Sequence, residues 1–147
     1  MKRWVFYIVL LSWCAAGFTG CLHAAPIQGK YVDRVVLCTA YCPCKKCCGW
    51  KRTWYGKAVV ASGKYAGRPK QVGITASGTK AKKGTIAADT SVYPFGTRMY
   101  IPGYGYGTVE DRGSAIQGGH IDLFFKRHHQ AVHWGEQRLK IRIWVAR

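Results

Sequence analysis

Short β-type segments alternate with glycine-rich turns along most of this chain. Residues 126–134 are the one segment with a helical pattern, and Gly135 follows it, where the end of a helix favours glycine. Many short strands with one short helix favour a small closed barrel, because closure removes exposed strand edges. We predict strands at residues 32–41, 57–61, 72–76, 84–88, 97–101, 107–110, 120–125 and 139–146.

The N-terminal residues have the composition of an export signal. Lys2 and Arg3 precede an apolar stretch that runs to Phe18, and small residues follow it. The stretch is too short to cross a bilayer comfortably, which takes about 20 apolar residues. We therefore predict a signal peptide at residues 1–25 and a single domain at residues 26–147, with no membrane-spanning segment.

The sequence before Cys21, Phe18-Thr-Gly, also resembles a lipobox, in which the cysteine is lipidated and becomes the new N-terminus. Lipidation of Cys21 remains open, because cleavage after Ala24 or Ala25 would remove that residue. The predicted location is the periplasm or the outer membrane, with Cys21 as the lipid anchor if it is modified. Without an outer membrane, the protein would be secreted or bound to the cell wall.

The chain is strongly basic, with 23 Lys and Arg against six Asp and Glu and a formal net charge of +17. Such a charge favours a polyanionic partner. Export argues against nucleic acid, which leaves an anionic membrane surface or an acidic polymer of the cell wall or envelope as the partner, and we expect the protein to be a monomer. We expect the basic insert at residues 50–71 and the lysine run at residues 80–83 to contribute most to the cationic surface.

Five cysteines cluster in one short stretch of the predicted mature chain, and an exported protein of this kind favours disulfides. The alternative is a thiolate metal site, since Cys-x-Cys-x-x-Cys-Cys could supply four soft ligands. We favour disulfides because zinc ligands are usually two well-separated pairs, but the pairing cannot be deduced. The candidates are Cys38, Cys42, Cys44, Cys47 and Cys48.

Three of the six acidic residues stand at strand ends or in apolar surroundings, namely Asp89, Asp111 and Asp122. In an alternating strand, Asp122 shares a face with His120, while Ile121 and Leu123 point the other way. A carboxylate in such a strand is costly unless it is hydrogen-bonded, paired or part of a site. From spacing alone, a turn-capping role for each aspartate is the more common explanation.

Five short motifs follow one another in a characteristic order. They are Thr75-Ala-Ser-Gly78, Gly84-Thr-Ile-Ala-Ala-Asp89, Tyr93-Pro-Phe-Gly-Thr97, Tyr106-Gly-Thr-Val-Glu-Asp-Arg-Gly113 and Ile121-Asp-Leu-Phe124. Together they resemble the 3D domain family, which is named for three aspartates. That family is similar to the C-terminal part of membrane-bound lytic transglycosylase A and to stationary-phase survival proteins. Rare lipoprotein A is a more distant likeness, with histidine in place of Asp89.

The resemblance implies a six-stranded double-psi β-barrel that cleaves peptidoglycan glycan strands and needs no cofactor or metal. The three aspartates of the family fall on Asp89, Asp111 and Asp122. A lytic transglycosylase can use one carboxyl group to protonate the leaving oxygen and then to deprotonate the muramyl 6-hydroxyl, which closes a 1,6-anhydro ring. We expect Asp122 to be this acid/base because its strand is the most apolar, while Asp111 and Asp89 orient the sugar.

Three further residues are candidates for binding substrate. Arg112 follows Asp111 directly and is expected to favour its ionised form. Thr75 and Ser77 could donate hydrogen bonds to a sugar, but capping of a turn explains their positions equally well. His129 and His133 have the i,i+4 spacing of zinc proteases, yet Gln130 replaces the required glutamate, so we predict no metal role for them.

Two functions from different classes therefore remain. The first is a peptidoglycan-cleaving enzyme of the lytic transglycosylase type, which the intact aspartate trio favours. The second is a catalytically inactive barrel whose cationic surface binds cell-wall glycan, which the small size of the chain favours. The two hypotheses differ in whether the protein releases products from peptidoglycan.

Overall fold

The computed structural model describes residues 29–144, so the predicted signal peptide and Cys21 lie outside the described residues. This part of the chain is built mainly from β-strands. Its elements are β1 (Tyr31–Tyr41), α1 (Lys45–Cys48), β2 (Trp50–Arg52), β3 (Ala58–Val60), β4 (Thr85–Ala88), β5 (Arg98–Ile101), β6 (Gly105–Asp111), β7 (Ile121–Phe124), α2 (His128–Trp134) and β8 (Gln137–Trp144).

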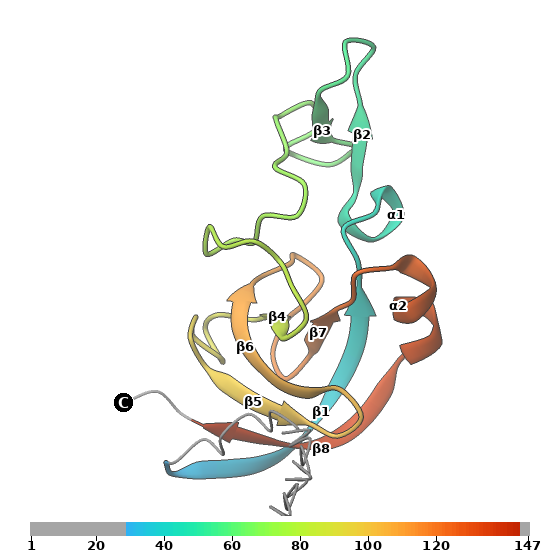
Figure 1. Cartoon of the computed structure of the whole chain (residues 1–147). Helices are drawn as coiled ribbons and strands as arrows, with labels where there is room; N and C mark the ends of the chain where they lie inside the picture. Colours follow the sequence, from blue (N-terminus) through green and yellow to red (C-terminus); the bar gives the residue numbers. More distant parts are fainter. Residues whose placement is uncertain (1–28, 145–147) are drawn as a thin grey trace, which may run out of the picture.

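Six of the strands form a closed barrel in the order β1-β7-β4-β6-β5-β8, and β8 pairs with β1 to complete it (Figure 1). Pairing is mixed, because β1 with β7 and β4 with β6 are parallel while the other pairs are antiparallel. Strand β1 is long enough to pair with β8 through its first part and with β7 through its last four residues. The predicted all-β, six-stranded barrel is thus confirmed.

The barrel interior is filled by the alternate residues of each strand. In β7, Ile121 and Leu123 are completely buried in the core, whereas Asp122 between them points to the other face of the barrel wall, as predicted. A second, smaller cluster of Tyr41, Ala87 and Phe124 lies on that other face. Both faces of this part of the wall are therefore packed, and the outer one carries the candidate site.

The predicted helix is present as α2, which ends at Gly135 with a positive φ of 65°. It begins two residues later than expected because Arg127 has an extended backbone and forms the N-cap. Two short elements were not predicted, the single turn α1 and strand β2. None of the helices among residues 29–144 is long and apolar enough to cross a membrane.

The strand predicted at residues 72–76 was wrong. This segment is a tight turn, in which only Ile74 forms an isolated bridge, to Lys80. The Thr75 hydroxyl bonds to the backbone of Thr79, and a neighbouring backbone N–H, that of Ala76, donates to Asp111. Local side-chain bonds of this kind compete with strand pairing.

Strands β2 and β3 pair with each other and form an arm that projects away from the barrel (Figure 1). The arm displays aromatic and basic side chains, and Trp54 at its tip is 95% exposed. Arg68 lies 4.8 Å from the ring centre of Tyr65, and Arg52 lies 5.9 Å from that of Trp50. The part of the predicted basic insert that lies in this arm therefore projects away from the barrel.

Gly107 has the least room of the barrel glycines, so Gly107→Ala should destabilise the fold. A Cβ atom there would lie 2.7 Å from the Ile86 side chain and 2.8 Å from the Gly84 carbonyl oxygen. Overpacking of a core usually costs about 1–3 kcal/mol of stability. We expect a loss in the upper part of that range, because the backbone oxygen cannot move aside as a side chain can. Equilibrium urea unfolding measures the loss. Gly119→Ala is the control, because nothing lies within 4 Å of a Cβ there. Equal stabilities of the two variants would contradict the packing described.

Candidate functional site

Two of the three aspartates lie in one row across four neighbouring strands. The register aligns Asp111 of β6 with Ala87 of β4, Ala87 with Asp122 of β7, and Asp122 with Thr39 of β1. Aligned residues of neighbouring strands share a face of the sheet, so the two carboxylates point into the same space. Their Cα atoms are two strand spacings apart, about 10 Å. The small side chain of Ala87 leaves the space between them open.

A β-bulge places Asp111 in this row. Strands β4 and β6 pair Ile86 with Val109, but the next residue, Ala87, pairs with Asp111 instead of Glu110. The extra residue in β6 redirects the side chain that follows it, a common role of bulges beside functional sites. Glu110 is used elsewhere, since its carboxylate accepts a 2.6 Å hydrogen bond from the Thr85 hydroxyl.

Asp122 is partly buried and hydrogen-bonded to strand β1. Its Oδ1 accepts a 2.9 Å hydrogen bond from the Thr39 hydroxyl, whose oxygen lies 2.8 Å from Nε2 of His120. When the Thr39 hydroxyl gives its single proton to Asp122, a hydrogen on Nε2 of His120 would complete the bond between His120 and Thr39. Burial raises the pKa of Asp122 and the negative charge of Asp111 raises it further, while Thr39 and His120 oppose this shift.

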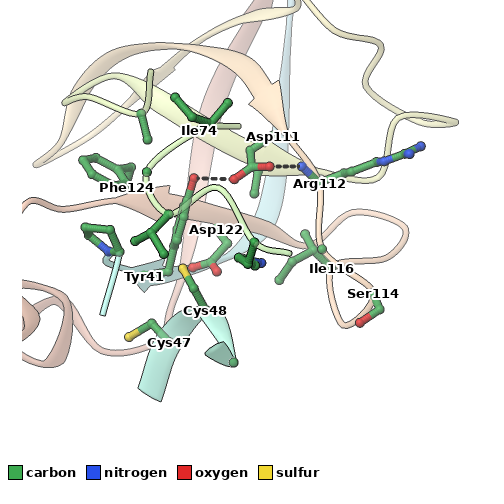
Figure 2. Close-up of a pocket in the computed structure, with 18 of the residues that line it drawn as sticks. Tyr41, Cys47, Cys48, Ile74, Asp111, Arg112, Ser114, Ile116, Asp122 and Phe124 are labelled. Carbon is green, nitrogen blue, oxygen red and sulfur yellow. Dashed lines mark hydrogen bonds between the residues drawn. The ribbon is translucent and has the colours of Figure 1, made fainter. Parts of the chain in front are cut away.

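Asp111 is held by three hydrogen bonds, of which Figure 2 shows those from Tyr41 and Arg112. Its Oδ1 accepts from the backbone N–H groups of Ala76 and Arg112, each at 2.9 Å, and its Oδ2 accepts from the Tyr41 hydroxyl at 2.9 Å. Three donors fix the position of this carboxylate. The Thr75–Gly78 turn thus contributes to the site through its backbone.

Asp111 and Asp122 line a groove of about 470 Å³. Tyr41, Ala87 and Phe124 form its floor, and Figure 2 shows the Tyr41 hydroxyl bonded to Asp111. Three loops form the walls, and all of them join barrel strands or lead into the arm. Their groove-lining residues are 47–49, 70–74 and 112–116.

Asp89 lines an adjoining hollow, which shares Arg112, Gly113, Ser114 and Ile116 with the groove. Its carboxylate accepts hydrogen bonds from the hydroxyl and backbone N–H of Ser91, at 2.6 and 3.0 Å, and from the N–H of Gly118 at 2.9 Å. These bonds, with that of the Ser91 hydroxyl the strongest, lower the pKa of Asp89. Asp89 therefore ties two loops together beside the groove instead of joining the other two aspartates within it.

The predicted substrate-binding residues lie around the groove in different ways. The hydroxyls of Thr75 and Ser77 are 3.0 Å apart, and both also lie near the Thr79 hydroxyl, which is the geometry of a braced turn. Arg112 lines the groove, but its guanidinium points away from Asp111, to which only its backbone donates (Figure 2). Arg112 is thus free to contact a bound molecule.

The five cysteines of the described residues are free thiols, so the structure does not contain the favoured disulfides. Cys38 is buried in the barrel core, and Cys48 lines the groove. The other three lie together beside His128, the first residue of α2.

Three residues of the site were not predicted as functional: Thr39, Tyr41 and His120. Alternation already indicated that His120 shares a face with Asp122. Thr39 and Tyr41 are two positions apart at the end of β1 and therefore lie on one face of that strand. Only the parallel pairing of β1 with β7 shows that this is the face that carries Asp122. The missing information was the strand order.

Residues 84–147 match the family described as the 3D domain, and this confirms the resemblance for that part of the chain. Two proteins of Bacillus subtilis are similar in alignments of 75 residues, which cover 48% of this chain. YabE, whose name refers to cell wall shaping, is 41% identical, and the cell wall-binding protein YocH is 36% identical. The matches span only 18% of YabE and 26% of YocH.

Solved structures of one protein, the lytic transglycosylase MltA of Escherichia coli, are similar over part of the chain. The complex with chitohexaose is 20% identical with a TM-score of 0.41, and covers 48% of this chain and 26% of that one. Another MltA crystal structure is 20% identical with a TM-score of 0.40, and covers 52% of this chain and 29% of that one.

Proposed function

We propose that this protein cleaves the glycan strands of peptidoglycan outside the cytoplasm, with Asp122 as the acid/base. One observation carries the proposal: Asp122 is a carboxyl group with a raised pKa in a groove, opposite the fixed carboxylate of Asp111. A general acid must be protonated near the working pH, and burial beside a like charge has that effect. The match to the 3D domain and the cell-wall names of both relatives support the substrate.

The groove fits a reaction of the lytic type. Asp122 donates its proton to the glycosidic oxygen, while positive charge develops on the muramyl ring. Asp111 stabilises this charge, since its three hydrogen bonds fix its carboxylate beside the reacting sugar. The Asp122 carboxylate then accepts the proton of the muramyl 6-hydroxyl, whose oxygen bonds to C1 and closes the 1,6-anhydro ring. Both the donated and the recovered proton reside on one carboxyl group, so no second acid is needed.

Incubation of the purified protein with insoluble peptidoglycan tests whether it cleaves at all. Release of soluble muropeptides above that of a boiled sample is expected. Binding without release would contradict the enzyme and support the second candidate function, a non-catalytic glycan-binding barrel.

The β2–β3 arm favours this second function. It carries exposed aromatic rings at Trp54, Tyr55 and Tyr65, which can stack on sugars, together with basic side chains. One similar protein is named as cell wall-binding. Binding and cleavage are compatible, because the arm and the groove are separate parts of the molecule.

Retention on peptidoglycan should depend on charge. Lys80, Lys82 and Lys83 are exposed, and the formal charge of the chain is +17, so the surface should attract anionic wall polymers. Salt screens such attraction beyond about 10 Å at 0.1 M. Pull-down should weaken as salt rises, and weaken again when these three lysines become glutamine. Retention that neither salt nor the substitutions reduce would contradict the electrostatic contribution.

A further inference from the structure

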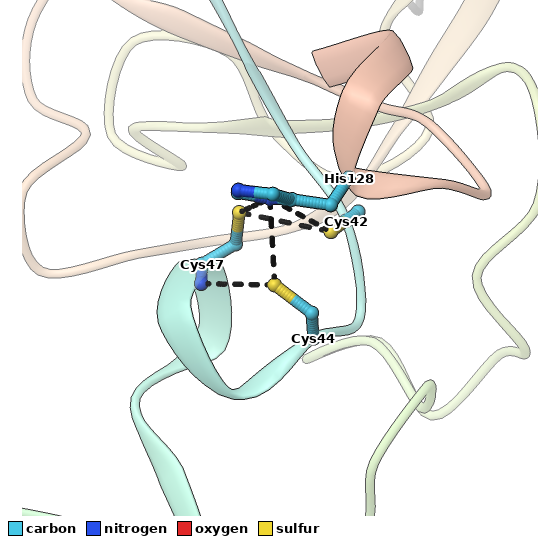
Figure 3. A group of neighbouring side chains, drawn as sticks. All are labelled: Cys42, Cys44, Cys47 and His128. Atoms are coloured by element: carbon cyan, nitrogen blue, oxygen red, sulfur yellow. Dashed lines mark hydrogen bonds between the residues drawn. The ribbon is translucent and has the colours of Figure 1, made fainter. Parts of the chain in front are cut away.

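Four side chains from two distant segments meet beside the groove. Cys42 and Cys44 precede α1 and Cys47 lies within it, whereas His128 begins α2, more than eighty positions further along the chain. Their ligand atoms all lie within 4.8 Å of one another (Figure 3). The sequence indicated the cysteines as soft ligands but not the histidine, which only the fold brings to them.

The distances agree with the edges of a tetrahedron around one metal ion. Nδ1 of His128 lies 3.7, 3.6 and 3.5 Å from the Sγ atoms of Cys42, Cys44 and Cys47, and the Sγ atoms of Cys42 and Cys47 are 3.7 Å apart. Zinc binds sulfur at about 2.3 Å and imidazole nitrogen at about 2.0–2.1 Å, so a tetrahedral site has S–S edges of about 3.8 Å and S–N edges of about 3.6 Å. A disulfide would instead require about 2.05 Å between two of the sulfurs.

The surroundings also suit thiolates. The backbone N–H of Cys47 donates to Sγ of Cys44 at 3.4 Å, a bond that stabilises negative sulfur. Three thiolates and a neutral imidazole around a divalent ion leave one net negative charge. Lys45 and Lys46 lie between the ligands in the sequence and offset that charge.

From this geometry we infer that Cys42, Cys44, Cys47 and His128 bind one zinc ion in a closed structural site, in addition to the proposed function of the groove. Three sulfurs and one nitrogen in a tetrahedron are the ligands and the geometry that zinc takes in structural sites. The ion releases the three thiol protons on binding, and no redox step occurs.

The site would fix one side of the groove. It links the loop after β1 to the start of α2, and the residues next to its ligands, Tyr41 and Cys48, line the groove. Tyr41 donates to Asp111 from this position. Metal binding therefore holds the cysteine-rich loop, and with it the base of the β2–β3 arm, against the barrel.

Metal analysis of the purified full chain tests the inference. We expect one zinc ion per chain by elemental analysis and native mass spectrometry, and a thiolate-to-metal charge-transfer band when Co²⁺ replaces zinc. Removal of the ion by a chelator should lower the melting temperature, which added Zn²⁺ restores. A chain that contains disulfides and no metal after preparation with zinc would overturn the inference.

Two pairs of variants separate ligands from neighbours. His128→Ala and Cys44→Ser should weaken zinc binding by at least about tenfold, whereas His129→Ala and Cys48→Ser should keep one ion per chain. Unchanged zinc affinity in the first pair, or its loss in the second, would contradict the ligand set.

Alkylation of the wild-type chain provides a test that needs no variant to fold. Cys42, Cys44 and Cys47 should become reactive together when the chelator is added. Protection by zinc at other cysteines, or at none, would overturn the inference.

Discussion

Asp122→Asn is expected to reduce glycan cleavage by about 10²–10⁴-fold while the fold is retained. The amide has nearly the shape of the carboxyl group and can still accept the hydrogen bond from Thr39, but it cannot give up and recover a proton. Release of soluble muropeptides measures the loss, and circular dichroism confirms the fold. A folded variant with the wild-type rate would remove Asp122 from the mechanism.

The same substitution should change how stability depends on pH. Burial raises the pKa of Asp122 in the folded protein, so unfolding releases a proton in the interval between the unfolded and folded pKa values. This residue therefore makes the fold less stable as the pH rises through that interval, and the destabilisation is complete above the folded pKa. Asp122→Asn should be more stable than the wild type at neutral pH and lose this advantage in acid. Urea unfolding at several pH values measures the difference, and a constant difference would contradict the raised pKa.

Asp111→Asn is expected to reduce cleavage by about 10²-fold, because it removes the fixed negative charge opposite the developing positive charge. The side-chain oxygen can still accept from the N–H groups of Ala76 and Arg112, so the loop positions should be preserved. The residual activity should also have a different pH profile. Since the charge of Asp111 raises the pKa of Asp122, its loss should move the alkaline limb of the profile to lower pH.

His120→Gln is the matched comparison for this shift. His120 lowers the pKa of Asp122, so its replacement should move the alkaline limb to higher pH, opposite to Asp111→Asn. A purely structural role of either residue would change the rate without these opposite shifts. An unchanged alkaline limb in both variants would contradict the assignment of that limb to Asp122.

The sequence predicted the barrel well because alternation and glycine-rich turns report directly on strands. Ile121, Asp122 and Leu123 show this most clearly, since two of them are buried in the core and the third faces the groove. Residues 72–76 were wrongly predicted as a strand because apolar residues there are followed by Thr75, whose local hydrogen bonds form a turn.

The site was less predictable because two of its features depend on pairing between distant strands. The bulge that brings Asp111 opposite Ala87 has no signature in the sequence of β6 alone. The meeting of His128 with the cysteine-rich loop depends on where α2 lies against β1. The resemblance to the family motifs predicted Asp89 in the same groove as the other two aspartates. Its hydrogen bonds to Ser91 and Gly118 hold it in the adjoining hollow instead.

The central claim is that Asp122 cleaves glycan strands by acting first as acid and then as base on the muramyl 6-hydroxyl. Mass analysis of the muropeptides released from purified peptidoglycan tests it most directly. The account predicts products with 1,6-anhydro-muramyl ends, which lack the mass of one water molecule relative to hydrolytic products. Products that contain the added water, or no products from a folded protein that binds the peptidoglycan, would contradict it.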